Sequence, residues 1–125
     1  MVSNVLEAYE KDLVARAELN IRDLMFLEPE EIAAEMKNRI TVERATEIRA
    51  LLNLTSLKGL TLPTAKELYA AGHDSKYRLL ETDAKEVVKQ VNAQRAIEGR
   101  APLDEKEERK LAKILESNQD VLDEW

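Results

Sequence analysis

Apolar residues recur at steps of three and four positions along most of the chain, a spacing that places them on one face of an α-helix. The first stripe predicts a helix over residues 3–18, and the next predicts a short helix over 21–27. Pro29 is suited to the first turn of a third helix, and Thr41 is suited to cap a fourth over 42–53. No run of alternating apolar and polar residues indicates a strand. The first half of the chain is therefore expected to be helical.

The second half has the same character. Pro63 opens a helix that runs to Ala71, and Gly72 follows it where a left-handed C-terminal cap favours a residue without Cβ. Further helices are predicted from their caps. These are a short helix to about Glu81 capped by Ser75, a helix to about Ile97 capped by Thr82, and a helix over 105–117 opened by a capping box of Asp104 and Glu107.

The two halves align with each other when one is displaced by 55 residues. Residues 10–36 then match 65–91 without a gap, and a further shift of eight residues pairs the caps Thr41 and Asp104. Similar helices could match by chance in a chain rich in Ala, Leu, Glu and Lys, but the shared register of caps favours duplication. The matched pairs include Lys11/Lys66, Leu13/Leu68, Ala15/Ala70, Leu24/Leu79 and Glu31/Glu86, and Ala17 falls opposite Gly72.

Duplication divides the chain into three parts. Residues 3–54 form a first, degenerate repeat, residues 55–117 form a second repeat with a recognisable hairpin, and residues 118–125 form a C-terminal tail. We expect an all-α fold in which the two divergent repeats pack into one compact helical unit.

Residues 54–72 carry the clearest local motif. Its turn follows the pattern glycine, apolar residue, glycine, with Thr61 in place of the second glycine. The matching residues are Gly59, Leu60, Ala65, Leu68 and Gly72. This segment resembles a helix-hairpin-helix unit.

The resemblance extends over residues 10–117, where the chain is similar to an uncharacterised bacterial family of tandem, divergent helix-hairpin-helix (SAM-like) repeats. Beyond the hairpin it is carried by Val91, Asn92, Arg95, Arg100 and Pro102. The resemblance implies a compact all-α fold and no established activity.

Composition narrows the chemistry. The 125 residues include no Cys and one His, with 35% charged and 4% aromatic residues. Disulfides and thiolate chemistry are thereby excluded, and a cytoplasmic location is expected. No signal peptide or membrane-spanning stretch is present, so no membrane association is expected. His73 has no triad or metal-ligand partner in the sequence, and the acidic clusters are explained by helix capping. We expect no enzyme activity, cofactor, metal or small-molecule substrate.

Charge is unevenly distributed. Residues 1–36 carry a net charge of −6, residues 37–78 carry +4, and residues 79–125 carry −4. The basic segment surrounds the hairpin, where backbone amides at a helix start could hold a phosphate group. An acidic protein surface is the other ligand that this charge would favour. The candidate contacts for phosphate or a partner are Lys58, Gly59, Leu60, Thr61, Lys66, Arg49, Lys76 and Arg78.

Two functions are compatible with these observations. The first is a non-catalytic interaction module, a protein-protein adaptor or assembly factor, with Tyr69, Tyr77 and Trp125 as candidate anchors for a partner. The alternative is low-specificity binding of a nucleic-acid backbone through the 58–66 hairpin. The acidic segments on both sides favour a protein partner, since they would repel a polyanion unless folded away from it.

Overall fold

The computed structural model describes residues 5–124, and all regular secondary structure in that range is helical. This confirms the prediction of an all-α fold. The α-helices are joined by short turns, and 3-10 helices precede α2 and follow α7. The elements are α1 (Ala8–Arg16), η2 (Ile21–Met25), α2 (Pro29–Glu35), α3 (Val42–Thr55), α4 (Leu62–Ala70), α5 (Lys76–Glu81), α6 (Ala84–Ile97), α7 (Glu105–Ser117) and η3 (Gln119–Glu124).

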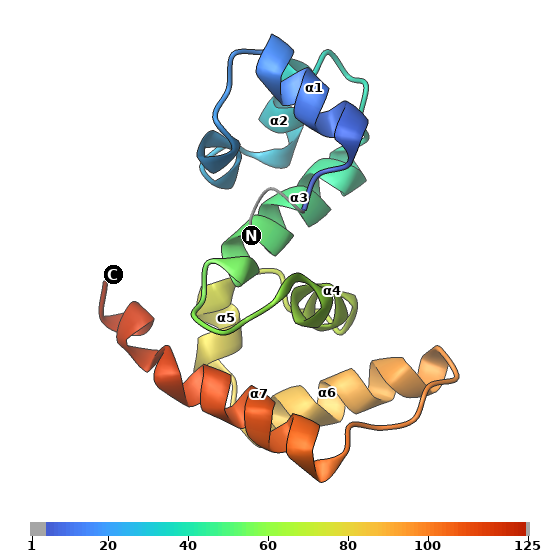
Figure 1. Ribbon diagram of the computed structural model, residues 1–125, viewed down its shortest axis with the longest axis vertical. Helices are drawn as coiled ribbons and strands as arrows, with labels where there is room; N and C mark the ends of the chain where they lie inside the picture. The colour runs from blue at the N-terminus through green and yellow to red at the C-terminus, as the bar shows by residue number, and fades with distance from the viewer. Residues whose placement is uncertain (1–4, 125) are drawn as a thin grey trace.

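The helix α3 lies at the centre because its apolar side chains cover more than one face. A helix that is apolar around most of its circumference needs neighbours on several sides. One end of α3 packs against η2 and α2, and the other packs against α4 (Figure 1). Its buried residues are Ala45, Ile48, Ala50, Leu51, Leu52 and Leu54.

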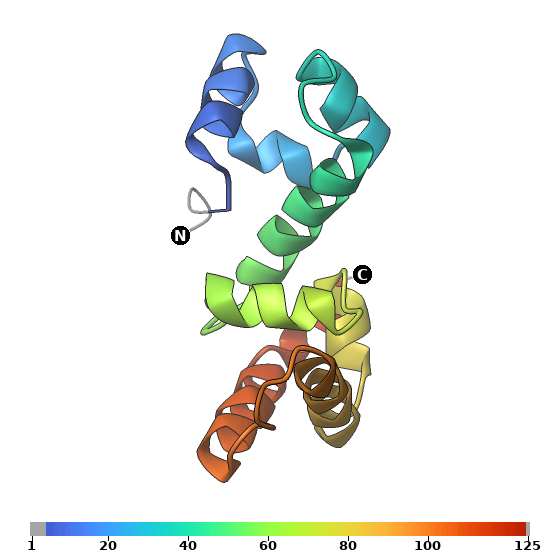
Figure 2. The same ribbon diagram turned by 90° about the vertical axis from the view of Figure 1, so that its right-hand side faces the viewer.

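The other helices form two groups along α3. α1, η2 and α2 surround its N-terminal end, and α4 to α7 lie around and beyond its C-terminal end (Figure 1). Within the second group, α4 lies across α6 and α7 (Figure 2). One apolar core runs through both groups, from Val14 and Leu24 to Val87 and Leu115.

A buried ion pair attaches the N-terminal segment to α3. The carboxylate of Glu10 is fully buried and accepts from Arg44 Nε and Nη2, both at 2.7 Å. The same Nη2 donates to the Val5 carbonyl at 3.0 Å, and Arg44 Nη1 pairs with Glu47. Burial raises the pKa of Glu10, but the hydrogen bonds from Arg44 and the Glu7 amide outweigh it and hold that pKa below its usual value.

The helix ends follow the expected capping chemistry at several positions. Gly72 has φ +106°, and the amide of His73 donates to the Leu68 carbonyl at 2.9 Å. This is the Schellman arrangement that a glycine after Ala71 predicts. The capping box of Asp104 and Glu107 is also present and opens α7.

Two predicted helix starts are wrong. The helix predicted over 3–18 begins at Ala8, because Glu7 and Glu10 form a capping box that sets its start; residues 3 and 4 lie outside the described range. Val5 and Leu6 are buried without being helical. Thr82 does not cap α6. Its hydroxyl donates to the Arg78 carbonyl at the end of α5, and Asp83 occupies the N-cap instead.

The lengths of the helices also bear on membrane association. Within residues 5–124, none of the helices combines the length and the apolar character needed to cross a bilayer.

Candidate functional site

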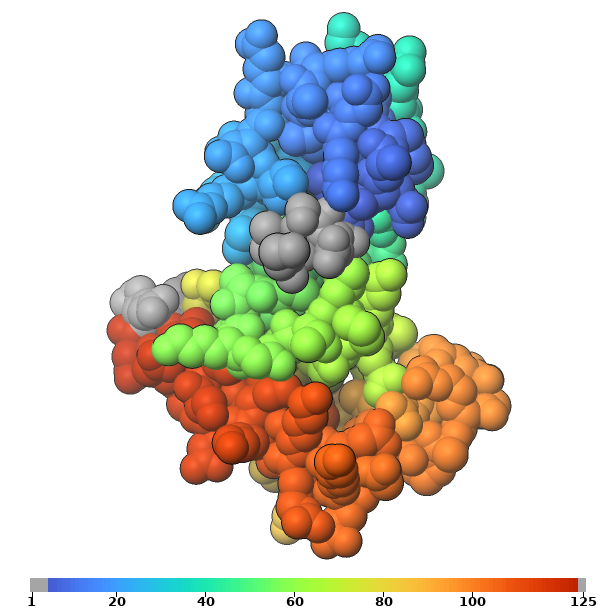
Figure 3. All heavy atoms as spheres, in the orientation of Figure 1, coloured from blue at the N-terminus to red at the C-terminus, as the bar shows by residue number. Residues whose placement is uncertain are grey.

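A groove of about 480 Å³ lies between α4, α6 and α7. It is hollowed into the face seen in Figure 3, below α4 and above the two C-terminal helices. Apolar side chains from all three helices line it, together with Leu103 from the loop that joins α6 to α7. These apolar residues are Leu68, Val91, Leu103, Leu111 and Ile114.

A network of charged side chains fixes one end of the groove. Glu67 of α4 accepts from Arg95 of α6 at 2.8 Å and from Arg100 of the following loop at 3.0 Å. Arg95 also pairs with Glu107 of α7 at 3.3 Å. The side chains of Arg95 and Glu67 are only 11% and 16% exposed, so this pair is weakly screened by solvent. The hydrogen bonds that Arg95 donates to Glu67 raise the pKa of Arg95.

The loop that closes this end is held against α6. Asn92 Oδ1 accepts from the Leu103 amide at 2.8 Å, and Arg95 Nη1 donates to the Ala101 carbonyl at 3.2 Å. Gly99, with φ +72°, allows the chain to leave α6 in the left-handed conformation. The groove is therefore bounded by residues whose positions are set by hydrogen bonds.

His73 helps to hold α4 against α6. It is buried in the turn after α4, and its Nε2 shares a hydrogen bond with Gln90 Oε1 of α6. The single histidine therefore connects two of the helices that form the groove, α4 and α6.

The structure places the hairpin turn against the end of α7. Asn118 is 2% exposed, and its Oδ1 accepts from the Lys58 amide while its Nδ2 donates to the Lys58 carbonyl, both at 3.0 Å. Gly59 has φ +81°, and a Cβ added there would lie 3.6 Å from Ile114. Leu60 is buried, and its amide donates to the Leu57 carbonyl. Two of the amides around this turn are thus engaged within the protein.

The remaining predicted contact residues are dispersed. Arg49 pairs with Glu28 at 3.6 Å, and Arg78 pairs with Asp74 at 3.3 Å. Lys76 donates to Ser56 Oγ at 3.4 Å and lies 5.3 Å from the centre of the Tyr77 ring. Thr61 is exposed at the N-cap of α4, and its Oγ1 lies 3.3 Å from that of Thr64. Of the predicted basic residues, Lys66 lines the groove.

Two of the predicted aromatic anchors, Tyr69 and Tyr77, are partly buried. Tyr69 packs partly against the core, and burial raises its pKa, with a further contribution from the negative charges of Glu47 and Asp74. Tyr77 is also partly buried. Trp125 lies outside the described residues. Phe26, by contrast, is 82% exposed.

Sequence reasoning missed the groove but not Phe26, which is among the aromatic residues expected to anchor a partner if they lie exposed. The run of four apolar residues over 24–27 agrees with its exposure, since one helical face cannot bury four consecutive side chains. The groove had no comparable signal. Glu67 and Arg95 are 28 residues apart, and their pairing depends on how α4 packs on α6.

Comparison of the chain with protein-family models, with curated proteins and with solved structures yields no match.

Proposed function

We propose that this chain is a non-catalytic binding module for another protein, an adaptor or assembly factor, and that the groove between α4, α6 and α7 is its contact surface. The observation that carries the proposal is the combination of an apolar lining with a charged margin in one open groove. Protein interfaces have this composition, with an apolar centre and a polar rim.

The pairing of charges in the groove favours a protein partner over a small substrate. Small-molecule sites hold a few polar groups that converge on the ligand. Here the charged side chains form ion pairs with one another rather than pointing at a ligand: Arg95 pairs with Glu67 and Glu107, and Arg100 pairs with Glu67. Grooves between helices are also a common docking place for a helix of another protein.

Site-specific photo-cross-linking tests this proposal. A photoreactive residue at Thr64, which lines the groove, is expected to cross-link a partner in cells of the source organism. The same residue at Lys89, exposed on α6 and outside the groove lining, is the control. The captured protein is then purified and its dissociation constant for the full chain is measured.

A matched pair of variants shows whether the captured protein binds in the groove. Ala70 and Ala93 are both exposed, but only Ala70 lines the groove. Ala70→Trp is expected to weaken binding by about tenfold or more, the equivalent of about 1.4 kcal/mol, and Ala93→Trp to leave it unchanged. Equal affinities for the two variants, or a cross-link from Lys89 alone, would contradict the proposal.

Nucleic-acid binding through the 58–66 hairpin is the second candidate. It is favoured by the positive φ of Gly59, as the motif requires, and by the exposure of Lys58 and Lys66 beside the turn. Binding of duplex DNA is expected to weaken steeply between about 50 and 200 mM salt, with a smaller slope in Lys58→Ala and Lys66→Ala. Absence of binding at about 50 mM salt would exclude it.

We also infer that the two halves share one order of elements, as duplication predicts. The N-caps Asn20 and Glu28 lie 55 residues before the N-caps Ser75 and Asp83. Residues that lie 55 positions apart are also buried in both halves. The buried pairs are Leu24/Leu79, Ile32/Val87 and Met36/Val91. This agreement supports the tandem helix-hairpin-helix interpretation, and the lack of cysteine supports a cytoplasmic setting.

A further inference from the structure

The acidic side chains in the groove are already neutralised, but two of its basic side chains are not. Glu67, Glu98 and Glu107 each pair with Arg95 or Arg100. Lys66 and Lys110 also line the groove, and among the residues that the structure describes neither has an ion-pair partner. The groove therefore has an excess of positive charge in a protein whose net charge is −6.

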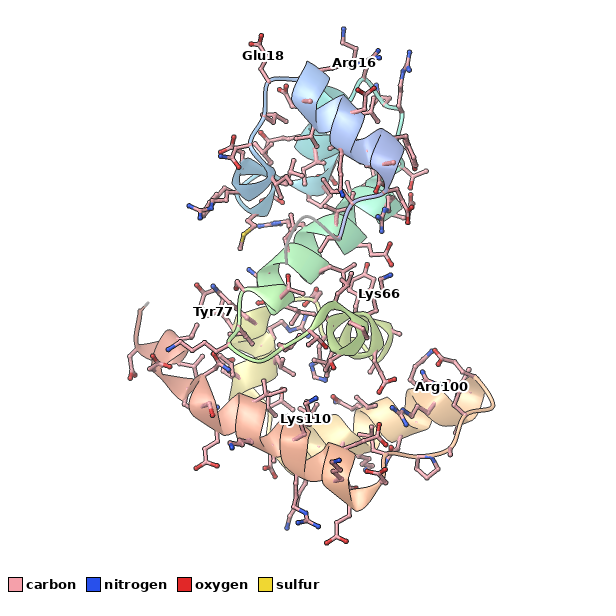
Figure 4. The ribbon with its side chains drawn as sticks, viewed as in Figure 1. Arg16, Glu18, Lys66, Tyr77, Arg100 and Lys110 are labelled. Atoms are coloured by element: carbon pink, nitrogen blue, oxygen red, sulfur yellow. The ribbon has the colours of Figure 1, made fainter. Side chains whose placement is uncertain are left out.

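These two lysines come from different walls of the groove. Lys66 belongs to α4 and Lys110 to α7, so the two lysines come from different helices that form the groove (Figure 4). The N-terminal turn of α4 adds to it. Pro63 and Thr64 of that turn line the groove, and the turn contains no acidic residue to balance the positive end of the helix dipole.

We propose that the groove binds an acidic amphipathic helix of a partner protein. The apolar face of that helix would lie on the lining formed by Leu68, Leu111 and Ile114. Its carboxylates would lie near Lys66, Lys110 and the start of α4. This assignment rests on the proposed function and adds the chemical class of the partner segment to it.

The chain's own acidic tail is already engaged elsewhere. Gln119 Nε2 donates to the carbonyls of Leu80 and Leu115, both at 3.1 Å. Val121 and Leu122 pack against the core. Residues 119–124 are thus held between α5 and α7 and do not occupy the groove.

A nucleic-acid occupant fits the groove less well. About half of its lining residues are apolar, and Glu98 and Glu107 line the same opening as the lysines. Phosphate groups would meet these carboxylates, whereas an amphipathic helix can place apolar side chains on the lining and carboxylates beside the two lysines.

Two designed peptides test the charge preference. Both have about 14 residues, or about four helical turns, with leucines at the same helical positions; one carries Glu and the other Lys at the flanking positions. Each is titrated into the ¹⁵N-labelled full chain. The acidic peptide is expected to shift the amide signals of α4, α6 and α7 around the groove, and its affinity should fall about tenfold or more in Lys66→Glu/Lys110→Glu.

The double variant Lys85→Glu/Lys113→Glu is the matched control. It introduces the same change of charge at exposed lysines of α6 and α7 that lie outside the groove lining. Binding of the acidic peptide should be nearly unchanged in this control. For the unmodified chain, the affinity for the acidic peptide should fall as the salt concentration rises, because charge pairs on the rim are screened.

Several outcomes would overturn the inference. Equal affinity for the two peptides, or binding by neither, would contradict a preference for acidic helices. Displacement of the acidic peptide by a short duplex DNA would assign the groove to nucleic acid. A cross-linked partner whose bound segment is basic would reject the inference while leaving the proposed function intact, whereas loss of the Thr64 cross-link itself would reject both.

Discussion

Arg44 satisfies a carboxylate that has no access to water. Glu10 is fully buried, and both of its oxygens accept hydrogen bonds from the guanidinium. Removal of one partner from such a pair leaves a buried charge without compensation. Because Arg44 also donates to the Val5 carbonyl, this one side chain connects α1 and the residues just before it to α3.

We expect Arg44→Ala to lower the free energy of unfolding by about 3 kcal/mol. Urea denaturation of the full chain measures this change. Arg16→Ala is the control, because Arg16 pairs with Asp12 on the surface, where both side chains are more than half exposed. Its expected effect is within about 0.5 kcal/mol. An equally small loss in Arg44→Ala would show that the buried pair contributes little to the attachment of α1.

The same pair makes stability depend on pH. The pKa of Glu10 is lowered in the folded state, so its contribution is present above the unfolded pKa of about 4.3 and is lost as the pH falls through the folded value. Thermal unfolding of Glu10→Gln should therefore differ from that of the unmodified chain most at about pH 6–7. The difference should shrink below about pH 4. A difference that stays constant across this range would contradict the assignment.

At the scale of helices, the residues that follow the C-terminal ends show where the backbone is strained. α4 and α6 are followed by glycines with positive φ, but α1 and α2 are followed by Glu18 and Lys37 at φ 58° and 55°. The left-handed residue after α1 is Glu18 rather than Ala17, so it lies 54 rather than 55 residues before Gly72. A side chain in this conformation costs about 1–2 kcal/mol that glycine does not.

Glu18→Gly and Lys37→Gly are expected to raise the free energy of unfolding by about 0.5–1 kcal/mol each, since glycine's greater freedom in the unfolded chain offsets part of the relief. Chemical denaturation checks this. Ala34→Gly, at an exposed position inside α2, should lower stability by about 1 kcal/mol. If Lys37→Gly were as destabilising as Ala34→Gly, the left-handed conformation would not be strained.

The helices could be predicted from the sequence to the extent that local chemistry sets their ends. Gly72 and the Asp104 capping box gave the correct turn and start. Thr82 misled, because threonine can also close the preceding helix by bonding back to a carbonyl, as it does here. The start of α1 was missed because Val5 and Leu6 continue the apolar stripe although they are buried outside the helix.

At the scale of the whole molecule, the decisive contacts join residues that are distant in sequence. The groove depends on Glu67 meeting Arg95 and Arg100, and the hairpin depends on Lys58 meeting Asn118, 60 residues away. No local pattern encodes such pairings. The basic segment around the hairpin was visible in the sequence, but tertiary packing directs its side chains to different neighbours.

Asn118 is the contact that joins the hairpin turn to the end of α7. It exchanges two hydrogen bonds with the Lys58 backbone, and its Nδ2 also donates to the Ile114 carbonyl at 2.7 Å. Asn118→Ala would leave the amide and carbonyl of Lys58, which the buried Asn118 side chain now contacts, without these partners. We expect a loss of about 2–3 kcal/mol in the free energy of unfolding, measured by urea denaturation.

A local readout separates this effect from general destabilisation. In Asn118→Ala the Lys58 amide should exchange its hydrogen with solvent much faster than in the unmodified chain, under conditions where the amides of α3 keep their protection. Ser117→Ala, at an exposed neighbouring position, should change neither quantity. Since α4 follows directly from this turn and forms one wall of the groove, the acidic peptide should also bind Asn118→Ala more weakly. Unchanged exchange at Lys58 would mean that the turn is held by the packing of Leu57 and Leu60 rather than by Asn118.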